Sequence, residues 1–317
     1  MKKIEIVPYN KKWPQIYAKE AKLIENALDI NFVTVHHIGS TSVPGLAAKP
    51  KIDIIAVVKN GDLSISQLEN NCFTYKGEWN IPFKFGFTKR TPNKINLHVL
   101  EENHPEIELN ILFRDYLCAN LEDRNKYEKI KQELLLDKAS FEKQNDSMFL
   151  GYTLGKDKFI RHILQTIGYS QLRFLFVTHI IEWTEYHRIK KEVIFDPFGV
   201  QYDPQHHCIS SNSSYHFILC KGTQVVTVAH IQLLNEDNAV LSFLATDSKF
   251  QRQGYGKKMM FLLEKWLKKQ KIKVFIVKSG IGLEAFYRKL GFIKFFLDES
   301  AEYYLNQEKT VNLAKII

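Results

Sequence analysis

The stretch Gln251-Arg252-Gln253-Gly254-Tyr255-Gly256 decides how the second half of the chain is interpreted. It follows a β-type run, Ala239 to Thr246, and precedes a lysine-rich run with apolar residues at helical spacing. A glycine-containing turn that begins a helix leaves backbone N–H groups unpaired, and the helix dipole adds partial positive charge. Such a helix start binds phosphate or pyrophosphate, and Arg252, Lys257 and Lys258 add charge. The alternative is an ordinary helix start, because a lone Gly-x-Gly is a weak signal.

Length and composition indicate two globular domains. The chain has 317 residues, of which 45% are hydrophobic and 13% aromatic. No apolar run reaches the roughly 18 to 20 residues of a membrane span, and the first residues lack the apolar stretch of a secretory signal. The four cysteines are scattered without a C-x-x-C pair, which argues against a zinc site or a disulfide framework. We therefore expect a cytoplasmic protein that does not associate with a membrane.

The net charge of +9 lies mostly in the second half. After residue 168 there are 20 Lys and Arg against 14 Asp and Glu, whereas up to that point there are 24 against 21. Much of the excess lies around the glycine-containing turn and the lysine-rich run Lys257 to Lys271. No zinc-finger pattern, RNA-binding aromatic signature or long basic tail accompanies it. A small polyanionic ligand therefore explains the charge at least as well as nucleic acid, and nucleic-acid binding is not expected.

Polar residues interrupt an apolar pattern in the first half. After a helix entered at Pro14, the sequence predicts a strand, a tight turn with a short helix, and a second strand from Ile52 to Val58. In the turn Gly39-Ser40-Thr41-Ser42, the hydroxyls either donate to an anion or cap the following helix. Asp53 is the only carboxylate in the second strand, where it needs a cation, a metal or a donor. An ion pair with a neighbouring lysine is the simpler alternative.

These segments resemble the GrpB (UPF0157) family over about residues 3 to 167. The resemblance is carried by "YNKKWPQIYAKE", "HHIGSTSVPGLAAKPKIDI", "INLHV" and "FRDYL", and the G-S-T-S-V-P-G-L-x-x-K-P-x-x-D run is highly specific. It implies that residues 1–168 form a domain with a nucleotidyltransferase-like mixed sheet and helices. In nucleotidyltransferases a Gly-Ser turn holds the nucleotide phosphates, and carboxylates bind Mg²⁺.

By this resemblance the first domain binds a nucleotide or another phosphorylated ligand. The residues expected in its pocket are Gly39, Ser40, Thr41, Ser42, Lys49, Asp53, His98 and Arg114. No metal site is assigned, although Asp53 is a candidate Mg²⁺ ligand. The usual D-x-D pair is absent because Lys51 and Ile55 flank Asp53, and Glu78, Glu106 and Glu108 are alternatives for a second ligand. Arg114 either binds phosphate or forms an exposed ion pair, and Lys156 either reaches the pocket or is solvated.

The strand-rich second half resembles the GNAT (Gcn5-related N-acetyltransferase) family over about residues 172 to 300. Gln251-x-x-Gly254-x-Gly256 matches the family's Q/R-x-x-G-x-G/A signature, and "LEAFYRKLGF" matches the segment after its fifth strand. The resemblance implies that residues 169–317 form a GNAT domain, with a central, mostly antiparallel sheet flanked by helices. The whole chain is then an α+β protein of two domains.

The GNAT resemblance also implies acetyl-CoA as cofactor and the residues that hold it. The pyrophosphate would bind the segment Gln251, Arg252, Gln253, Gly254, Tyr255, Gly256 and Lys257, and the pantetheine arm would pair with the backbone of Ala245 and Thr246. Tyr287 aligns with the general acid, and we expect it to face away from the core, although a core aromatic beside Phe286 is the alternative. For the general base, His230, Glu182, His216 and a water chain remain open.

The sequence thus predicts an acetyl-CoA-dependent N-acetyltransferase that acts on a small-molecule or peptide amine. Nothing in the sequence selects among amines. The alternative function is a Mg²⁺-dependent nucleotidyltransferase in the first domain, with the GNAT domain as a coenzyme A sensor or accessory.

Overall fold

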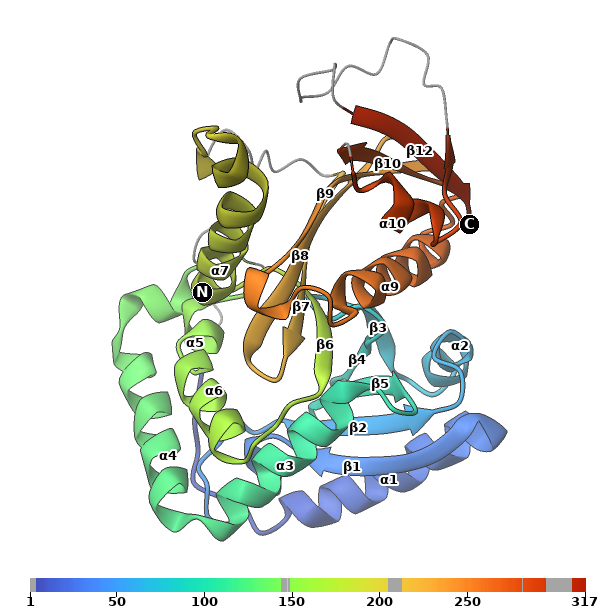
Figure 1. Cartoon of the computed structure of the whole chain (residues 1–317). Helices are drawn as coiled ribbons and strands as arrows, with labels where there is room; N and C mark the ends of the chain where they lie inside the picture. Colours follow the sequence, from blue (N-terminus) through green and yellow to red (C-terminus); the bar gives the residue numbers. More distant parts are fainter. Residues whose placement is uncertain (1–3, 144–146, 148, 205–212, 281, 295–309) are drawn as a thin grey trace. The chain divides into compact units, whose positions relative to one another are not determined.

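The chain forms two compact units, Met1–Arg173 and Phe174–Ile317, which are described separately. The computed structural model describes residues 4–143, 147, 149–204, 213–280, 282–294 and 310–317. Both units combine helices with a β-sheet (Figure 1), so the protein is an α+β protein of two domains, as the sequence predicts. The expected boundary, after Gly168, lies shortly before the strand β6 (Leu172–Phe176), in which the first unit ends.

The first unit contains a mixed sheet of five strands in the order β1-β2-β5-β4-β3. Strand β2 runs parallel to β5, and the other neighbouring pairs are antiparallel. The strands are β1 (Phe32–Ile38), β2 (Ile52–Val58), β3 (Thr74–Gly77), β4 (Phe85–Lys89) and β5 (Ile95–Glu101). The bounds predicted for β2 are confirmed.

One face of this sheet forms the main core of the unit. The helices α1 (Trp13–Leu28) and α2 (Leu63–Glu69) contribute Ile24, Leu28 and Leu68 to the core, which also contains alternate residues of β2, β4 and β5. Because side chains alternate between the two faces of a strand, the intervening residues of β2 and β5 point to the opposite face. That face carries Asp53 and His98.

The remaining helices of the first unit follow β5. They are α3 (Pro105–Ala119), α4 (Leu121–Leu136), α5 (Gly151–Leu154) and α6 (Asp157–Thr166). Ile107 of α3 packs on Ile55 and Leu100, which lie on the face opposite α1. Leu117 and Tyr127 pack with Leu46 of the loop that precedes β2, so α3 and α4 hold this loop in place.

The second unit contains a sheet of seven strands in the order β11-β12-β10-β9-β8-β7-β6. Strands β9 and β10 are parallel, whereas β7–β8, β8–β9, β10–β12 and β11–β12 are antiparallel. The other strands are β7 (Ser214–Lys221), β8 (Gln224–Leu233), β9 (Asn238–Thr246), β10 (Val274–Gly280), β11 (Ile293–Lys294) and β12 (Thr310–Ile316). Strands β7 and β8 form a hairpin whose turn contains Gly222, with φ of 59°.

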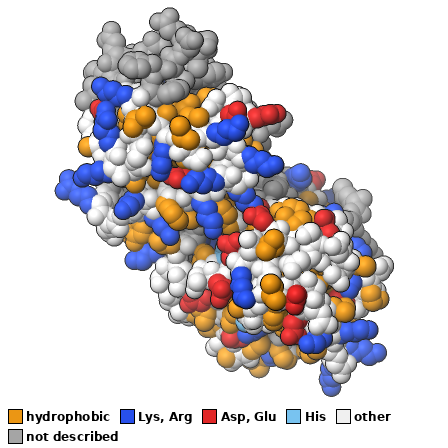
Figure 2. Space-filling model, turned by 90° about the vertical axis from the view of Figure 1, so that its right-hand side faces the viewer, with side chains coloured by type: hydrophobic (Ala, Val, Ile, Leu, Met, Phe, Trp, Pro, Cys, Tyr) orange, Lys and Arg blue, Asp and Glu red, His pale blue; other side chains and the backbone are white. Residues whose placement is uncertain are grey.

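Helices lie on both faces of this second sheet (Figure 1). On one face Tyr186 of α7 (Ile180–Lys190) packs on His216 and Phe243. On the other face Trp266 of α9 (Tyr255–Lys269) packs on Phe217, and the short helix α10 (Glu284–Arg288) follows β10. Exposed lysines occupy the outer side of α9, and Figure 2 shows Lys and Arg side chains spread over this part of the surface. Within the described ranges, no helix has the length and apolar character needed to cross a bilayer.

A buried ion pair between α1 and β4 makes the packing of the first unit testable. Lys89 Nζ lies 2.8 Å from Glu20 Oε2, and the side chains are only 9% and 2% exposed. We expect Lys89→Met to lower the free energy of unfolding by about 3 kcal/mol, because it leaves the buried carboxylate without its cation. The measurement is urea unfolding followed by hydrogen exchange in β2 and β5, which reports on this unit alone.

The double variant Glu20→Met/Lys89→Met serves as the control. It should recover most of the stability, because two apolar side chains replace the pair. A Lys89→Met protein as stable as the wild type would contradict the assigned role of this ion pair.

Candidate functional site

The turn after β1 packs directly on the Asp53 carboxylate. The β1–β2 pairing places Ile38 opposite Asp53, and Gly39 follows with φ of 70°. A Cβ atom on Gly39 would lie 2.8 Å from Asp53 Oδ2, so glycine is required here for both backbone conformation and space. Asn96 Nδ2 donates to Asp53 Oδ1 at 2.7 Å from the neighbouring strand. The structure therefore brings Gly39 and Asp53 together, as the sequence suggested.

The three hydroxyls of this turn have different roles. Ser42 Oγ donates to the carbonyl oxygen of Gly39 at 2.6 Å, and the buried Thr41 Oγ1 lies 3.0 Å from His37 Nε2. These two hydroxyls hold the turn itself, so the expectation that they face a ligand is corrected. Ser40 Oγ accepts a hydrogen bond from Lys131 Nζ at 3.4 Å. Of the three, Ser40 is the hydroxyl that faces a cluster of positive charge.

Four lysines from three segments of the chain converge on the turn and Asp53. We call these residues the lysine cluster: Lys49, Lys51, Lys131 and Lys156. The ammonium groups of Lys49 and Lys156 lie 3.9 and 5.0 Å from the ring centre of Tyr152. Lys131 Nζ donates to the carbonyl oxygen of Ala47 and lies 5.0 Å from the Tyr127 ring centre. Side-chain stems packed on aromatic rings hold the charges in place.

The electrostatics of the cluster show an excess of positive charge. Burial lowers the pKa of Lys49 to about 8, and repulsion from Lys156 and Lys51 adds to this effect. Burial likewise lowers the pKa of Lys131 to about 8, although Glu128 opposes the shift. Burial raises the pKa of the Asp53 carboxyl, and the Asn96 amide and three lysines of the cluster counteract it. Asp53 and Glu128 are the carboxylates that act on the pKa of Lys49 and Lys131, respectively.

Two predicted features of this pocket are not found among the described residues. Arg114 Nε donates to Asp115 Oδ1 at 2.7 Å, and its Nη1 donates to the carbonyl oxygen of His37, so the ion-pair alternative is the observed one. No carboxylate is among the groups that act on the pKa of Asp53, and the candidate Glu106 pairs with Arg173 at 2.6 Å. In the described ranges no three His, Cys, Asp or Glu side chains come together as a metal site. Lysines, rather than carboxylates, dominate the pocket.

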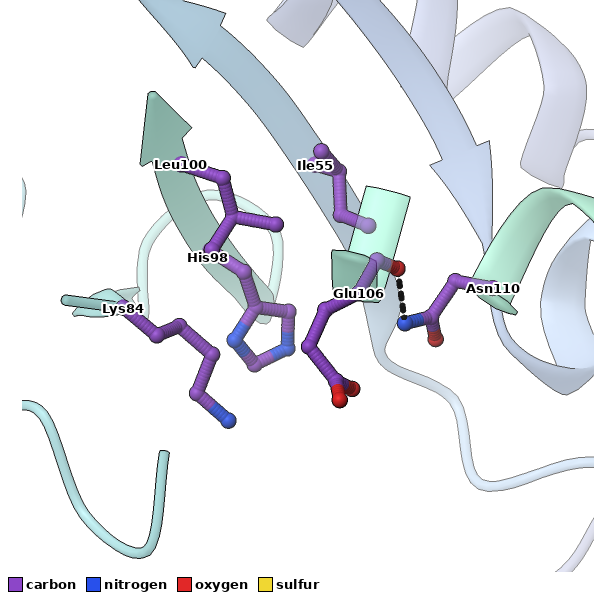
Figure 3. A pocket seen from close by; sticks show the side chains of 6 residues that line it. All are labelled: Ile55, Lys84, His98, Leu100, Glu106 and Asn110. Atoms are coloured by element: carbon purple, nitrogen blue, oxygen red, sulfur yellow. Dashed lines mark hydrogen bonds between the residues drawn. The ribbon is translucent and has the colours of Figure 1, made fainter. Parts of the chain in front are cut away.

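A second polar cavity of about 110 Å³ adjoins Asp53 on the same face of the sheet. It is lined by Ile55, Lys84, His98, Leu100, Glu106 and Asn110 (Figure 3). Burial lowers the pKa of Lys84 to about 8, although Glu106 opposes the shift. Burial also lowers the pKa of His98 to about 3, with help from Lys84 and Lys51, so the imidazole is neutral at pH 7. The predicted pocket residue His98 thus belongs to this cavity and not to the lysine cluster.

Lys84 and Lys131 were not predicted as site residues, although the sequence around each of them indicates a buried lysine. Lys84 is the single cation in the apolar run "IPFKFGF", just as Asp53 is the single anion in β2. Lys131 follows Tyr127 by one helical turn and therefore shares its face of α4. Because Tyr127 is buried, that face is the inner one.

In the second unit, the loop between β9 and α9 forms a cradle of backbone groups. Arg252 and Gly254 both have left-handed backbone conformations, with φ of 59° and 86°. The side-chain amide Nε2 of Gln251 donates to the carbonyl oxygen of Thr246, and Nε2 of Gln253 donates to that of Lys249. Helix α9 begins at Tyr255, and no side chain caps its first N–H groups. These N–H groups are therefore available to an anion.

Strand β9 loses its neighbour as it approaches this cradle. It pairs with β10 only from Asn238 to Leu241, whereas β9 itself continues to Thr246. A register shift near His230 adds an extra residue to β9 at the point where β9 and β10 stop pairing. On this side no described strand pairs with Ala245 and Thr246, so an extended ligand can add to the free edge. A Cβ on Gly256 would lie 3.5 Å from Thr246 Oγ1, so the cradle and the free edge adjoin.

Tyr287 lies on α10, and its side chain is more buried than expected. It is 5% exposed and packs on Phe286 and Phe292, with ring centres 5.1 and 5.9 Å away. The expectation that Tyr287 faces away from the core is thus wrong, because Phe286 is the more exposed of the two. Burial raises the pKa of Tyr287 to about 12, so the phenol keeps its proton at neutral pH.

The three candidate bases differ in their surroundings. Glu182 accepts hydrogen bonds from the backbone N–H groups of Thr178 and His179, so it caps α7. The His216 and His230 rings stack 4.4 Å apart, and Tyr186 Oη lies 2.7 Å from His216 Nδ1. Burial lowers the pKa of His230 to about 4, with repulsion from Lys190. These two imidazoles are neutral at pH 7, whereas the Glu182 carboxylate is already engaged.

Comparison with known protein families agrees with this division into two units. Residues 3–166 match the family described as GrpB protein, and residues 194–303 match the family described as acetyltransferase (GNAT) domain. The chain is thus a two-domain protein with a GNAT acetyltransferase domain in its second unit. It belongs to the GrpB family.

Individual relatives resemble one unit at a time. The UPF0157 protein YqkA of Bacillus subtilis is 34% identical over 168 residues, which are 50% of this chain and 46% of that protein. The chain therefore aligns with less than half of this relative. The structure of GrpB from Enterococcus faecalis is 30% identical and covers 50% of this chain and 94% of its own, with a TM-score of 0.44. The ribosomal-protein-S18-alanine N-acetyltransferase of Escherichia coli is 16% identical and covers 45% and 91%, with a TM-score of 0.37.

The lowered pKa of Lys84 predicts how stability depends on pH. An unfolded lysine keeps its proton up to about pH 10.4, whereas folded Lys84 releases it near pH 8. Between these values the unfolded state binds more protons, so the free energy of unfolding rises with pH. From about pH 7 to about pH 10 the wild type should gain about 2 kcal/mol relative to Lys84→Met. Urea unfolding followed by hydrogen exchange in β4 and β5 measures this difference.

Lys76 of β3 is exposed and supplies the control. Lys76→Met should keep the wild-type dependence on pH. Equal slopes for the wild type and Lys84→Met would show that Lys84 keeps an ordinary pKa in the folded protein.

Proposed function

We propose that the second unit is an acetyl-CoA-dependent N-acetyltransferase that acts on a small-molecule or peptide amine. The observation that carries the proposal is the free edge of β9 beside an uncapped helix start. The N–H groups at the start of α9 bind the coenzyme pyrophosphate, with Gln251, Arg252, Gln253, Gly254, Tyr255, Gly256 and Lys257 forming the cradle. The backbone of Ala245 and Thr246 pairs with the pantetheine arm.

In the proposed reaction the amine attacks the thioester carbonyl carbon, the C–N bond forms and the C–S bond breaks. Tyr287 donates its phenolic proton to the departing thiolate, a role that its raised pKa permits because the phenol is protonated at pH 7. His216, His230 and a water chain remain the candidates for accepting the amine proton, although burial lowers the pKa of both imidazoles and makes them weak bases. Arg188 binds Asp247 at 2.5 Å, and this ion pair holds the loop that carries the cradle.

Isothermal titration with acetyl-CoA, followed by thiol release with a panel of amines, tests this function. Tyr287→Phe removes only a hydroxyl, so we expect kcat to fall about 100-fold while the dissociation constant for acetyl-CoA stays within about twofold. Tyr215→Phe, beside Trp266, is the matched control and should keep the wild-type rate. Absence of acetyl-CoA binding below about 1 mM would exclude the activity, and an unchanged rate in Tyr287→Phe would exclude its role as the acid.

We propose further that the lysine cluster binds the phosphate groups of a nucleotide or another phosphorylated ligand. The supporting observation is that lysines gather around Ser40 and Asp53, where Lys156 and Lys51 repel Lys49 and lower its pKa. Such repulsion is unfavourable in a partly buried site unless an anion binds. Lysine recognises phosphate as a point charge and does not need a metal ion. Mg²⁺-dependent nucleotidyl transfer at Asp53 is the alternative for this unit.

The cluster is tested by titrating ADP and inorganic tripolyphosphate in EDTA and again with Mg²⁺. We expect Lys156→Met to weaken binding about tenfold in EDTA, because one desolvated charge–charge contact is lost. Lys158→Met, at an exposed position two residues away, should bind like the wild type. Binding that requires Mg²⁺ and disappears in Asp53→Asn would favour the nucleotidyltransferase alternative.

A further inference from the structure

The cavity beside Asp53 contains a buried cation that the protein does not neutralise. Lys84 is 9% exposed and forms no hydrogen bond or ion pair through its side chain with any residue in the described ranges. The nearest carboxylate, that of Glu106, is already bound by Arg173 at 2.6 Å. A buried charge without a close partner is unfavourable. The cavity therefore has one positive charge available to a ligand.

Polar atoms around Lys84 also lack partners. Two buried atoms of β5 have no hydrogen-bond partner among the described residues: Nδ1 of His98, which lines the cavity, and Oδ1 of Asn96, two residues earlier on the strand. In Figure 3 the His98 imidazole lies between the side chains of Lys84 and Glu106, in the wall of the cavity. Buried polar atoms in folded proteins are almost always paired. A cavity of about 110 Å³ accommodates a group larger than a single water molecule, and a polar group on a ligand would satisfy these atoms.

The cavity and the lysine cluster lie along the same face of the sheet. Lys51 is close enough to act on the pKa of both Asp53, beside the cluster, and His98, in the cavity. Asp53 lies opposite Asn96, and His98 is two residues further along β5. Neighbouring strands are about 4.8 Å apart and alternate residues about 6.6 Å apart, so the backbone positions of Asp53 and His98 are about 8 Å apart.

We propose that the ligand of the first unit carries two anionic groups, of which one binds the lysine cluster and the other binds Lys84 in the cavity. The inference rests on the phosphate site proposed above and adds the chemical class of its ligand. Sugar bisphosphates and phosphorylated carboxylic acids have this character, whereas simple phosphate monoesters lack the second group. Lys84 thus determines specificity, because a monoester leaves its charge unneutralised.

The test compares fructose 1,6-bisphosphate with fructose 6-phosphate, which have the same sugar and differ in one phosphate. Calorimetric titration of the full-length protein in EDTA should show that the wild type prefers the bisphosphate at least about tenfold. Lys84→Met should abolish this preference and leave the affinity for the monophosphate within about twofold. Lys76→Met, at an exposed position of the same sheet, should keep the preference.

The outcomes separate this inference from the proposal on which it rests. Equal wild-type affinity for the two sugars would overturn the second subsite while leaving the phosphate site intact, as would an undiminished preference in Lys84→Met. Failure of the wild type to bind both sugars, tripolyphosphate and inorganic phosphate would overturn both. Lys84→Gln provides the same comparison if Lys84→Met does not fold, because it keeps a polar side chain without the charge.

Discussion

The parallel pairing of β2 with β5 determines where polar groups can lie in the first unit. It sets Asp53 opposite Asn96 and Ile55 opposite His98. Because the side-chain period of a strand is two, the apolar residues between them enter the core under α1, and a shift by one residue would bury every polar group there. The core and the polar face therefore specify each other. Both proposed anion subsites depend on this register.

The first unit neutralises its buried charges unevenly. Glu20 with Lys89, and Glu106 with Arg173, are paired at 2.8 and 2.6 Å. In contrast, the lysines of the cluster repel one another, and Lys84 contacts the Trp79 ring at 5.4 Å but forms no ion pair in the described part of the chain. Fully paired charges fix the packing of helices on the sheet, whereas incompletely paired charges favour binding of an anion. The paired charges thus stabilise the fold, whereas the incompletely paired charges are suited to recognise a ligand.

Much of this structure could be predicted from local patterns. The bounds of β2, the glycine turn after β1, the hairpin at Gly222 and the helix after the second glycine motif all follow from residue periodicity and turn chemistry. Assignments that depend on tertiary contacts could not be predicted in this way. Which hydroxyl of residues 40–42 faces the lysine cluster depends on contacts with His37 and Lys131. Lys131 is about ninety residues away from Ser40 in the sequence.

Dependence on tertiary contacts also explains the other features that the sequence did not predict. Strand β12 is defined by a tertiary contact, because it pairs with the edge of β10 and satisfies the backbone N–H and C=O groups there. The burial of Tyr287 depends on Phe292, which returns to α10 after the turn at Gly291. For Arg114 the sequence left two alternatives, and only the position of the β1 carbonyl group at His37 decides between them.

The cradle between β9 and α9 offers mainly backbone groups. Two of its glutamines bond to carbonyl groups of the loop itself, and the N–H groups of the helix start belong to every amino acid except proline. The cradle therefore depends on the backbone conformation, including the left-handed conformations of Arg252 and Gly254, more than on the chemistry of its side chains. The proposed coenzyme site therefore tolerates many side-chain changes as long as the path of the backbone is kept.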